Sequence, residues 1–247
     1  MRILLSGIGG QMGAEVMKLV SGGYRDAEVV FGGDKFASLK TEIPWSKTFD
    51  QARTDVDAVV DFSNHEMTGE LLEFCVKKQL PLVIATTGQT DDEKEQIRKA
   101  SEGIPVFFAS NYSLGVAALA GLAKKAAAMF PDADVEIVET HHRNKLDAPS
   151  GTALAIADAV REVRTEAEVT MGRSGFGKRK DGEIGIQAVR MGSETGTHEI
   201  FFAAGGETVS IRHEAQDRGL FADGALKAAC WLAGQKPGLY SMEDLVG

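Results

Sequence analysis

The sequence contains very little cysteine. Its 247 residues include only Cys75 and Cys230, and each lies in an apolar segment with a helical pattern. We therefore expect two buried, reduced thiols rather than a disulfide, a zinc site or a nucleophile, as is typical of the cytoplasm. The sequence also lacks an apolar run long enough to span a bilayer, and it lacks a long apolar signal region at its start. These absences predict a cytoplasmic protein without a membrane partner.

Positive charge is scarce relative to negative charge. The chain carries 27 lysines and arginines against 36 aspartates and glutamates, a formal net charge of -9. A nucleic-acid partner would favour the opposite balance, so we expect none, whereas a small anionic ligand needs only local positive charge. The hydrophobic fraction of 43% and charged fraction of 26% are typical of a globular protein with one large domain or two smaller ones.

Glycine, by contrast, is concentrated near the N-terminus. Residues 2–6 predict a buried strand, residues 14–20 predict an amphipathic helix, and between them lies GIGGQMG, residues 7–13. A strand, a glycine turn and a helix in this order favour dinucleotide binding, because glycines let the backbone approach a pyrophosphate. The spacing is G-x-x-G-x-x-G rather than the strict G-x-G-x-x-G, and a simple connecting turn is the alternative interpretation.

A pair of opposite charges follows the next predicted strand, residues 28–32. Asp34 lies about twenty residues beyond the glycines, where a dinucleotide-binding fold places the acid that binds the ribose hydroxyls. This acid favours NADH because it repels a 2'-phosphate, whereas Lys35 beside it attracts one. We therefore expect use of both NADH and NADPH, with ordinary surface charge as the alternative for Lys35.

Three more strands are predicted over residues 57–62, 82–85 and 104–109, and they alternate with helices. This alternation predicts a parallel sheet with right-handed crossovers, a Rossmann-like α/β domain. Ligands of such sheets bind at the carboxyl edge of the strands. Polar residues follow these strand ends, including Ser63, Thr86, Thr87, Asn111, Tyr112 and Ser113.

The densest group of reactive side chains is ETHHRNKLDAPSGT, residues 139–152. His141 and His142 end a predicted strand, residues 135–140, so we expect them to point to opposite sides. Lys145 follows closely enough to reach the same pocket, where it would serve as a proton donor. Adjacent histidines that diverge, with no second histidine at helical spacing, make a metal site a weaker interpretation.

The same stretch ends in a predicted anion site. The backbone amides of Ser150, Gly151 and Thr152 open a predicted helix over residues 153–160, and helix N-termini bind anions such as carboxylates. A helix cap and solvated side chains are the alternative interpretation of each residue taken alone. The concentration of all of them in one short stretch favours the functional interpretation.

The pattern changes after a long predicted helix, residues 114–129. Strands are predicted over residues 135–140, 183–191, 198–203 and 207–213, with a hairpin turn at residues 204–206. This predicts a second, mixed α+β domain over residues 113–216. The last predicted helix, residues 220–233, is expected to rejoin the nucleotide domain, which then comprises residues 1–112 and 217–247. The basic segment 173–180 is either a solvated loop or a mobile lid.

Several motifs together resemble one family. GIGGQMG, DFS, ATTG, ASNYSLGV and above all ETHHRNKLDAPSGTA are similar to the pattern of the bacterial 4-hydroxy-tetrahydrodipicolinate reductases, also called dihydrodipicolinate reductases, over essentially the whole chain. The resemblance implies NAD(P)H-dependent reduction of a small dicarboxylate in the diaminopimelate and lysine pathway. It also implies a homotetramer whose second domain carries the substrate site and the oligomer contacts.

The resemblance also assigns residues to roles. The catalytic residues it implies are His141 and Lys145. The substrate contacts are His142, Gly151 and Thr152, with Ser150 in the same anion cradle. The cofactor contacts are Gly7, Ile8, Gly9, Gly10, Gln11, Met12, Asp34, Lys35, Ala85, Thr86, Thr87, Ala109, Ser110, Asn111 and Tyr112.

This chain departs from the family pattern at three places, none of them at the proposed acids. Gln11 stands where many members have arginine, ATTG replaces GTTG, and the Asp34-Lys35 pair replaces a common Glu-Arg pair. The first two leave nucleotide contact intact because backbone groups do much of the binding, and the third leaves the cofactor preference open. The alternatives are another small imine-reducing Rossmann dehydrogenase and a nucleotide sensor without turnover.

Overall fold

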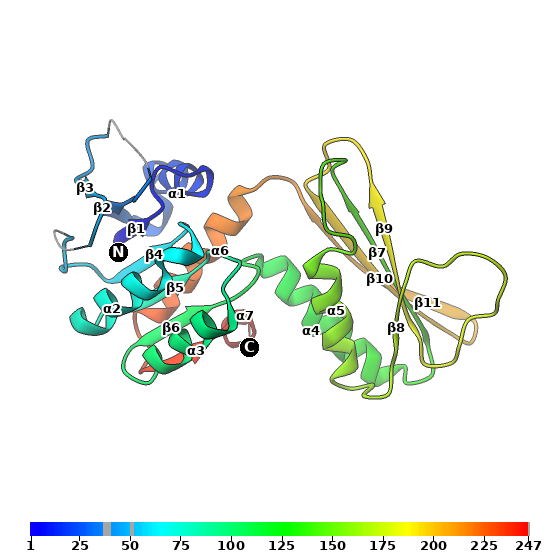
Figure 1. Ribbon diagram of the computed structural model, residues 1–247. Helices are drawn as coiled ribbons and strands as arrows, with labels where there is room; N and C mark the ends of the chain where they lie inside the picture. Colours follow the sequence, from blue (N-terminus) through cyan, green and yellow to red (C-terminus); the bar gives the residue numbers. More distant parts are fainter. Residues whose placement is uncertain (37–40, 50–51, 247) are drawn as a thin grey trace. The chain divides into compact units, whose positions relative to one another are not determined.

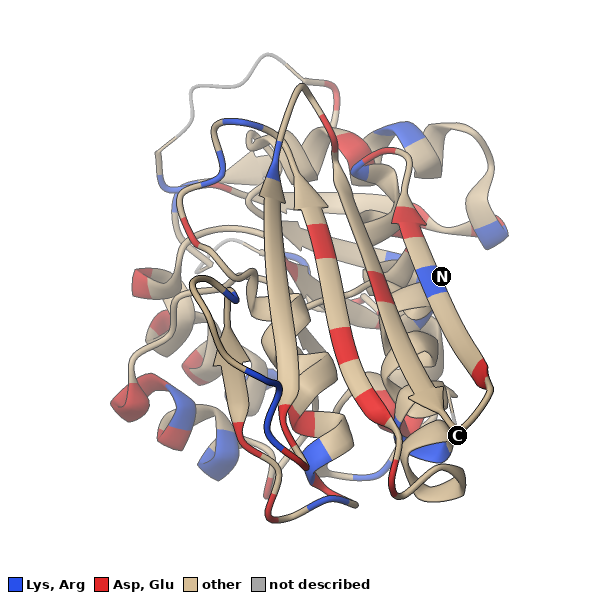
Figure 2. Cartoon of the chain, turned by 90° about the vertical axis from the view of Figure 1, so that its right-hand side faces the viewer, with Lys and Arg blue, Asp and Glu red and all other residues tan. Residues whose placement is uncertain are grey.

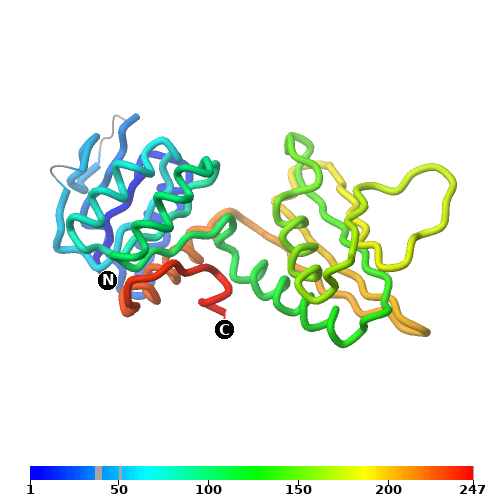
Figure 3. Tube along the Cα trace, turned by 60° about the horizontal axis from the view of Figure 1, so that its bottom comes forward, coloured from blue at the N-terminus to red at the C-terminus, as the bar shows by residue number. Residues whose placement is uncertain are grey.

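The structure is a computed structural model that describes residues 1–36, 41–49 and 52–246. The chain divides into two compact units, Met1–Ser113 with Arg218–Gly247, and Leu114–Asp217. The division lies one residue beyond each of the expected boundaries, after residues 112 and 216. In Figure 3 the last segment of the chain, drawn in orange to red, returns to the unit that contains the N-terminus.

The first unit is built on a parallel sheet, in which the strand order is β12-β6-β5-β4-β1-β2-β3 (Figure 1). The five central strands, from β6 to β2 in this order, are buried along most of their length, as expected when helices cover both faces of a parallel sheet. Their bounds are β1 Arg2–Ser6, β2 Glu28–Gly33, β3 Trp45–Ser46, β4 Ala58–Asp61, β5 Leu82–Ile84, β6 Pro105–Phe108 and β12 Gly238–Tyr240.

Helices and short 3-10 turns connect these strands. The helices of the first unit are α1 Gln11–Ser21, α2 Thr68–Lys78, α3 Asp91–Ala100, α6 Gly219–Leu232 and α7 Met242–Val246, and the 3-10 turns are η1 Tyr24–Asp26 and η2 His65–Met67. Helix α6 packs against α1 and against β4, β5 and β6. The last predicted helix therefore belongs to the first unit, where its apolar face completes the core.

The second unit has a mixed sheet, in the order β11-β10-β7-β9-β8. Strand β10 is antiparallel to β7 and β11, whereas β7 and β9 are parallel. The bounds are β7 Asp134–His141, β8 Val169–Met171, β9 Ile184–Arg190, β10 Gly196–Ala204 and β11 Glu207–Ala215, with helices α4 Leu114–Met129 and α5 Gly151–Arg161.

Helices α4 and α5 cover one face of this mixed sheet. Val135 and Ile137 of β7 are fully buried in a core that includes Ala123 of α4 and Ile156 of α5. Residues that alternate with them point to the other face, where acidic positions recur along the strands (Figure 2). The alternation follows from the side-chain period of two in a strand.

The observed architecture confirms the predicted fold class, a Rossmann-like parallel sheet followed by a mixed α+β region. The predicted hairpin turn is present, with Gly205 and Gly206 between β10 and β11. The short strands β3, β8 and β12 were not predicted. Within the described residues, no helix is both long enough and apolar enough to cross a bilayer.

Candidate active site

The glycine turn of the first unit leaves no room for a side chain at Gly7 or at Gly13. Gly7 has a φ of 80°, and a Cβ atom there would collide with the carbonyl oxygen of Phe62. A Cβ atom at Gly13 would collide with the carbonyl oxygen of Gly7. The turn therefore packs closely on the end of β4 and on its own helix, and Gly10 caps α1 without a side chain. This geometry fits a pyrophosphate, which needs exposed amides at a helix N-terminus.

Asp34 lies beside this turn at the end of β2. Its Oδ2 accepts a hydrogen bond from the Gly9 N–H at 2.9 Å, and its Oδ1 accepts one from the Phe36 N–H at 3.1 Å. A cavity of about 370 Å³ opens over Asp34, Lys35 and the glycine turn. The sequence-predicted ribose acid and pyrophosphate turn thus share one cavity.

A second cavity, of about 250 Å³, lies at the ends of β4, β5 and β6. Among the sequence-predicted cofactor residues, its lining includes Met12, Ala85, Thr87, Ser110, Asn111 and Tyr112. Phe221 of α6 also lines it and was missed, because an apolar residue in a helix more than a hundred positions further along the chain gives no sequence signal. A further cavity of about 290 Å³ adjoins the same strand ends and includes Thr86.

Several predicted contacts have other tasks in this unit. The buried Asp61 accepts hydrogen bonds from the hydroxyls of Thr86, at 2.7 Å, and Ser63, at 2.5 Å, and burial raises the pKa of Asp61. The Tyr112 hydroxyl donates to the Ile84 carbonyl at 2.8 Å. These side chains fix the strand ends, so they would meet a ligand through their backbone or ring atoms.

Three of the predicted cofactor contacts line none of these cavities. They are Ile8, Gln11 and Ala109. Ile8 is buried against Gly32, where a Cβ atom would collide with it. Gln11 accepts a hydrogen bond from Arg218 at 2.9 Å through its side-chain oxygen. Gln11 therefore holds Arg218, an arginine that belongs to none of the sequence motifs.

In the second unit, the centre of the reactive stretch is the buried carboxylate of Glu139. It lies 2.5 Å from Nδ1 of His141 and accepts two hydrogen bonds from Arg190, at 2.7 and 2.8 Å. Burial alone would raise the pKa of Glu139, but the hydrogen bonds from Arg190, His141 and the Ser150 N–H hold it below its ordinary value. An ionised Glu139 therefore holds the His141 imidazole by its Nδ1 proton, which leaves Nε2 for exchange.

A third histidine, His198, lies beside the Glu139–His141 pair. The rings of His198 and His141 meet edge to face at 5.1 Å, and Nε2 of His198 lies 3.0 Å from the Ser150 hydroxyl. Burial, followed by the charge of His141, lowers the pKa of His198 to about 4, so this imidazole is neutral near pH 7. Neither His198 nor Arg190 was predicted, because each reaches the site from a strand about fifty residues later in the sequence.

Lys145 lies in the turn after β7, and its ammonium pairs with Asp147 at 2.8 Å. The carbonyl of Asp147 in turn accepts a hydrogen bond from Arg190 at 2.7 Å. The two predicted catalytic residues are thus connected through one arginine, which binds Glu139 on one side and the Asp147 backbone on the other. Strand β7 ends at His141, and the half-buried His142 follows it, where its carbonyl accepts a hydrogen bond from the Lys145 N–H at 3.1 Å.

The predicted anion cradle at α5 is only partly open. The Ser150 N–H donates to Glu139 at 3.0 Å, and the Ser150 hydroxyl accepts from the Ala153 N–H at 3.2 Å. Ser150 is therefore a buried helix cap that also supports Glu139. Gly151 is exposed, with open space where a side chain would be, so an anion can approach the first-turn amides there.

The chain resembles known proteins along its whole length. The family model for the N-terminus of dihydrodipicolinate reductase matches residues 1–112, and the model for its C-terminus matches residues 115–246. The chain is 45% identical to the 4-hydroxy-tetrahydrodipicolinate reductase of Caldanaerobacter subterraneus over 247 residues, covering 99% of this chain and 98% of that one. It is 39% identical to the enzyme of the same name from Clostridium tetani, covering 99% and 96%.

A solved structure shares the whole fold. The dipicolinate-bound dihydrodipicolinate reductase from Paenisporosarcina sp. TG-14 aligns with a TM-score of 0.83 at 26% identity, covering 98% of both chains. The fold and these relatives thus define an NAD(P)H-dependent oxidoreductase. Within that class, the chain belongs to the dihydrodipicolinate reductase family, which confirms the resemblance drawn from its motifs.

Proposed function

We propose that this chain reduces 4-hydroxy-tetrahydrodipicolinate to tetrahydrodipicolinate, in diaminopimelate and lysine biosynthesis, with His141 and Lys145 as its acid–base residues. The observation that carries the assignment of residues is the network in which Glu139 holds His141 and Arg190, while Arg190 and Lys145 both engage Asp147. A core or a helix cap has no need of this arrangement. A proton-transfer site does, because it must fix an imidazole and an ammonium in defined positions.

The reaction needs a proton as well as a hydride. Loss of the substrate's hydroxyl as water leaves a conjugated cyclic imine, and NAD(P)H, when bound, supplies the hydride that reduces it. The electron-rich product must then take up a proton. The Lys145 ammonium is the donor, with Asp147 holding it in place, and His141 exchanges a proton through Nε2 while Glu139 retains Nδ1.

The two carboxylates of the substrate require local positive charge on a chain that is acidic overall. Gly151 and Thr152 provide the first-turn amides of α5, and Lys145 and His142 provide the neighbouring polar groups. Ser150 contributes by capping the helix, since its own N–H is engaged by Glu139. The Paenisporosarcina relative was solved with dipicolinate, a planar dicarboxylate.

The first unit would bind both NADH and NADPH at its two carboxyl-edge cavities. Gly7, Gly9 and Gly10 would receive the pyrophosphate, and Asp34 with Lys35 the adenosine ribose. The second cavity, whose lining residues include Met12 and Phe221, would receive the nicotinamide. We also assign the second unit to substrate binding and to a homotetramer, through the sheet face that α4 and α5 leave uncovered, and we place the enzyme in the cytoplasm.

Binding of a substrate-like dicarboxylate tests this assignment. Pyridine-2,6-dicarboxylate should bind the protein in the presence of oxidised cofactor, as measured by calorimetry, and pyridine-2-carboxylate should bind at least about tenfold more weakly because it lacks one charge-assisted contact. Equal binding of the two compounds, or none of either, would favour an imine reductase with a different substrate. A nucleotide sensor would bind cofactor but neither pyridine acid.

A further inference from the structure

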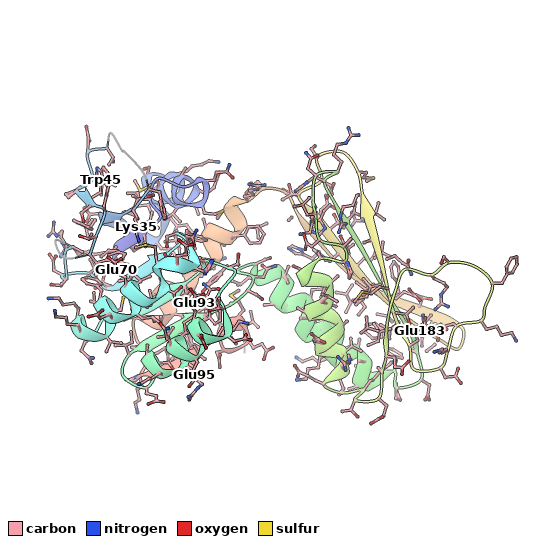
Figure 4. All side chains as sticks on the ribbon, viewed as in Figure 1. Lys35, Trp45, Glu70, Glu93, Glu95 and Glu183 are labelled. Atoms are coloured by element: carbon pink, nitrogen blue, oxygen red, sulfur yellow. The ribbon has the colours of Figure 1, made fainter. Side chains whose placement is uncertain are left out.

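Buried polar residues of the second unit gather at one end of its mixed sheet. They are Glu139, His141, Ser150 and His198. The buried Glu183, labelled in Figure 4, lies just before β9 begins, at the opposite end of the sheet, and binds Arg173 instead. His198 is thus a buried titratable group that contacts the proposed site but has no assigned role in it.

His198 binds the hydroxyl group of Ser150. Its Nε2 lies 3.0 Å from the Ser150 Oγ, which also accepts a hydrogen bond from the Ala153 N–H at 3.2 Å. The hydroxyl hydrogen needs an acceptor of its own, and among the residues that the structure describes this Nε2 is the one within reach. In this contact the hydroxyl therefore donates and the imidazole accepts.

The protonation of His198 agrees with this direction. Burial, followed by the charge of His141, lowers the pKa of His198 to about 4, so near pH 7 the neutral ring has one nitrogen free to accept. Nδ1 is buried and has no hydrogen-bond partner among the described residues. With the proton on Nε2, both the hydroxyl hydrogen and the Nδ1 lone pair would lack a partner, whereas with the proton on Nδ1 only one group does. The second arrangement is favoured because a buried polar group without a partner is costly.

Ser150 carries the effect of His198 into the site. Its hydroxyl caps the N-terminus of α5, and its N–H donates to Glu139 at 3.0 Å. The next residue, Gly151, is exposed and has open space where a side chain would be, so no side chain of its own fixes the direction of its N–H. A cap held in one orientation gives this order to the first-turn amides that would meet a substrate carboxylate.

Strand pairing brings His198 within reach of both parts of the site. His198 of β10 lies directly opposite Glu139 of β7 in the sheet register. Its ring meets the His141 ring edge to face, with 5.1 Å between the ring centres. One imidazole thus contacts the proposed acid–base histidine as well as the cap of the anion-binding helix.

We propose that His198 is a positioning residue for the reduction, because by accepting the Ser150 hydroxyl hydrogen it fixes the cap that presents the first-turn amides of α5 to a substrate carboxylate. The inference rests on the proposed function for the identity of that anion. His198 acts through Ser150 rather than on the substrate itself. The consequence is that substrate affinity depends on an acceptor at the Nε2 position.

Two amide substitutions separate this role from a loss of packing. Glutamine reaches about as far as Nε2 and can accept the hydroxyl hydrogen, whereas asparagine is one carbon shorter and cannot. With oxidised cofactor present, His198→Asn should bind pyridine-2,6-dicarboxylate about five- to tenfold more weakly than the intact protein in calorimetry, and His198→Gln should stay within about threefold. Turnover should fall in the same order. Cofactor affinity should not change, because the cofactor cavities lie in the first unit.

A double-mutant cycle shows whether the effect passes through Ser150. Ser150→Ala should weaken the same dicarboxylate, and adding His198→Asn to it should weaken binding by less than about twofold more. Ile200→Val is the control for packing and should leave the affinity unchanged, since Ile200 is buried two residues further along the same face of β10 and carries no polar group. Equal weakening by His198→Asn and His198→Gln, or full additivity with Ser150→Ala, would overturn the inference.

The intact protein provides a second test that depends on no variant. A neutron crystal structure near pH 7 should show deuterium on Nδ1 of His198, and deuterium on the Ser150 hydroxyl directed at Nε2. Deuterium on Nε2 would overturn the inference. Failure of the intact protein to bind the dicarboxylate would refute the proposed substrate and this positioning role with it, whereas binding that is unchanged in His198→Asn would refute only the role of His198.

Discussion

Oε2 of Glu139 lies 2.5 Å from Nδ1 of His141, two residues further along β7, and the carboxylate also binds Arg190 through both of its oxygens. Residues two apart on a strand share a face, so the strand itself brings this pair together. The pairing fixes which nitrogen of His141 carries its proton. It makes Glu139 a positioning residue rather than a direct participant in the chemistry.

Replacing Glu139 should therefore damage catalysis through His141. Glu139→Gln keeps the shape but removes the charge, so we expect turnover to fall about 10- to 100-fold, with an altered pH–rate profile and unchanged cofactor affinity. Glu162→Gln is the matched control, since Glu162 lies at the exposed C-terminal end of α5 and pairs with Lys124 instead. Equal losses in the two variants, or a profile identical to that of the intact enzyme, would remove Glu139 from this role.

Lys145→Ala should lower turnover by about 10²- to 10⁴-fold, because the proposed proton donor is lost. Cofactor affinity should be nearly unchanged, since the cofactor cavities lie in the first unit. The measurement is steady-state turnover together with cofactor binding. Lys125→Ala, at an exposed position of α4, should leave both values unchanged. Turnover equal to that of the intact enzyme in Lys145→Ala would exclude Lys145 from the mechanism.

Asp34→Ala should weaken NADH more than NADPH. The variant loses the acid that would bind the ribose hydroxyls of NADH, but for NADPH it also loses a charge that repels the 2'-phosphate. The variant also leaves the Gly9 and Phe36 N–H groups without their acceptor, and this loss weakens the binding of both cofactors alike. Dissociation constants for the two cofactors check this, and an equal loss for both would argue against a ribose role for Asp34.

The buried His198 should make the enzyme less stable in mild acid. Burial, with the charge of His141, lowers its pKa from 6.5 to about 4, so the unfolded chain takes up a proton over this range while the folded protein does not. The free energy of unfolding should therefore fall as pH falls from 6.5 to 4, with His198 contributing about 3 kcal/mol to the loss.

Urea unfolding at several pH values and one protein concentration measures this effect. His198→Asn has no titrating ring, so the difference between its stability near pH 7 and near pH 4.5 should be smaller than that of the intact protein. The absolute stability of the variant at pH 7 does not enter the comparison. An identical pH dependence in both proteins would show that His198 is not held neutral.

Much of the fold was predictable because its signals are local. The apolar strands, the glycine turn and the polar strand ends are each read from a few adjacent residues. Helix α1 begins at Gln11, three residues before its predicted start, because Gly13 is tolerated in a helix where it packs on the Gly7 carbonyl. Strands β3 and β12 pair over only two or three residues at the sheet edges, too few to form a pattern.

The site was predictable only in part, for the same reason. His141, Lys145 and Ser150 stand in one motif, whereas Arg190 and His198 come from β9 and β10 and join them only through strand pairing. Ser150 illustrates the limit: the sequence marks it as an anion contact or a helix cap, and only the fold adds that its N–H supports Glu139. Long-range register, which places Arg190 of β9 beside Glu139 of β7, leaves no local trace in the sequence.

The most direct test of the central claim is oxidation of NADPH and NADH by the purified protein, with the unstable substrate made in situ from pyruvate and aspartate semialdehyde by the preceding synthase. We expect rapid oxidation that depends on the synthase and is lost in Lys145→Ala. Absence of oxidation, in a protein that still binds both cofactors, would contradict the proposed reaction and point to another imine substrate or to a sensor.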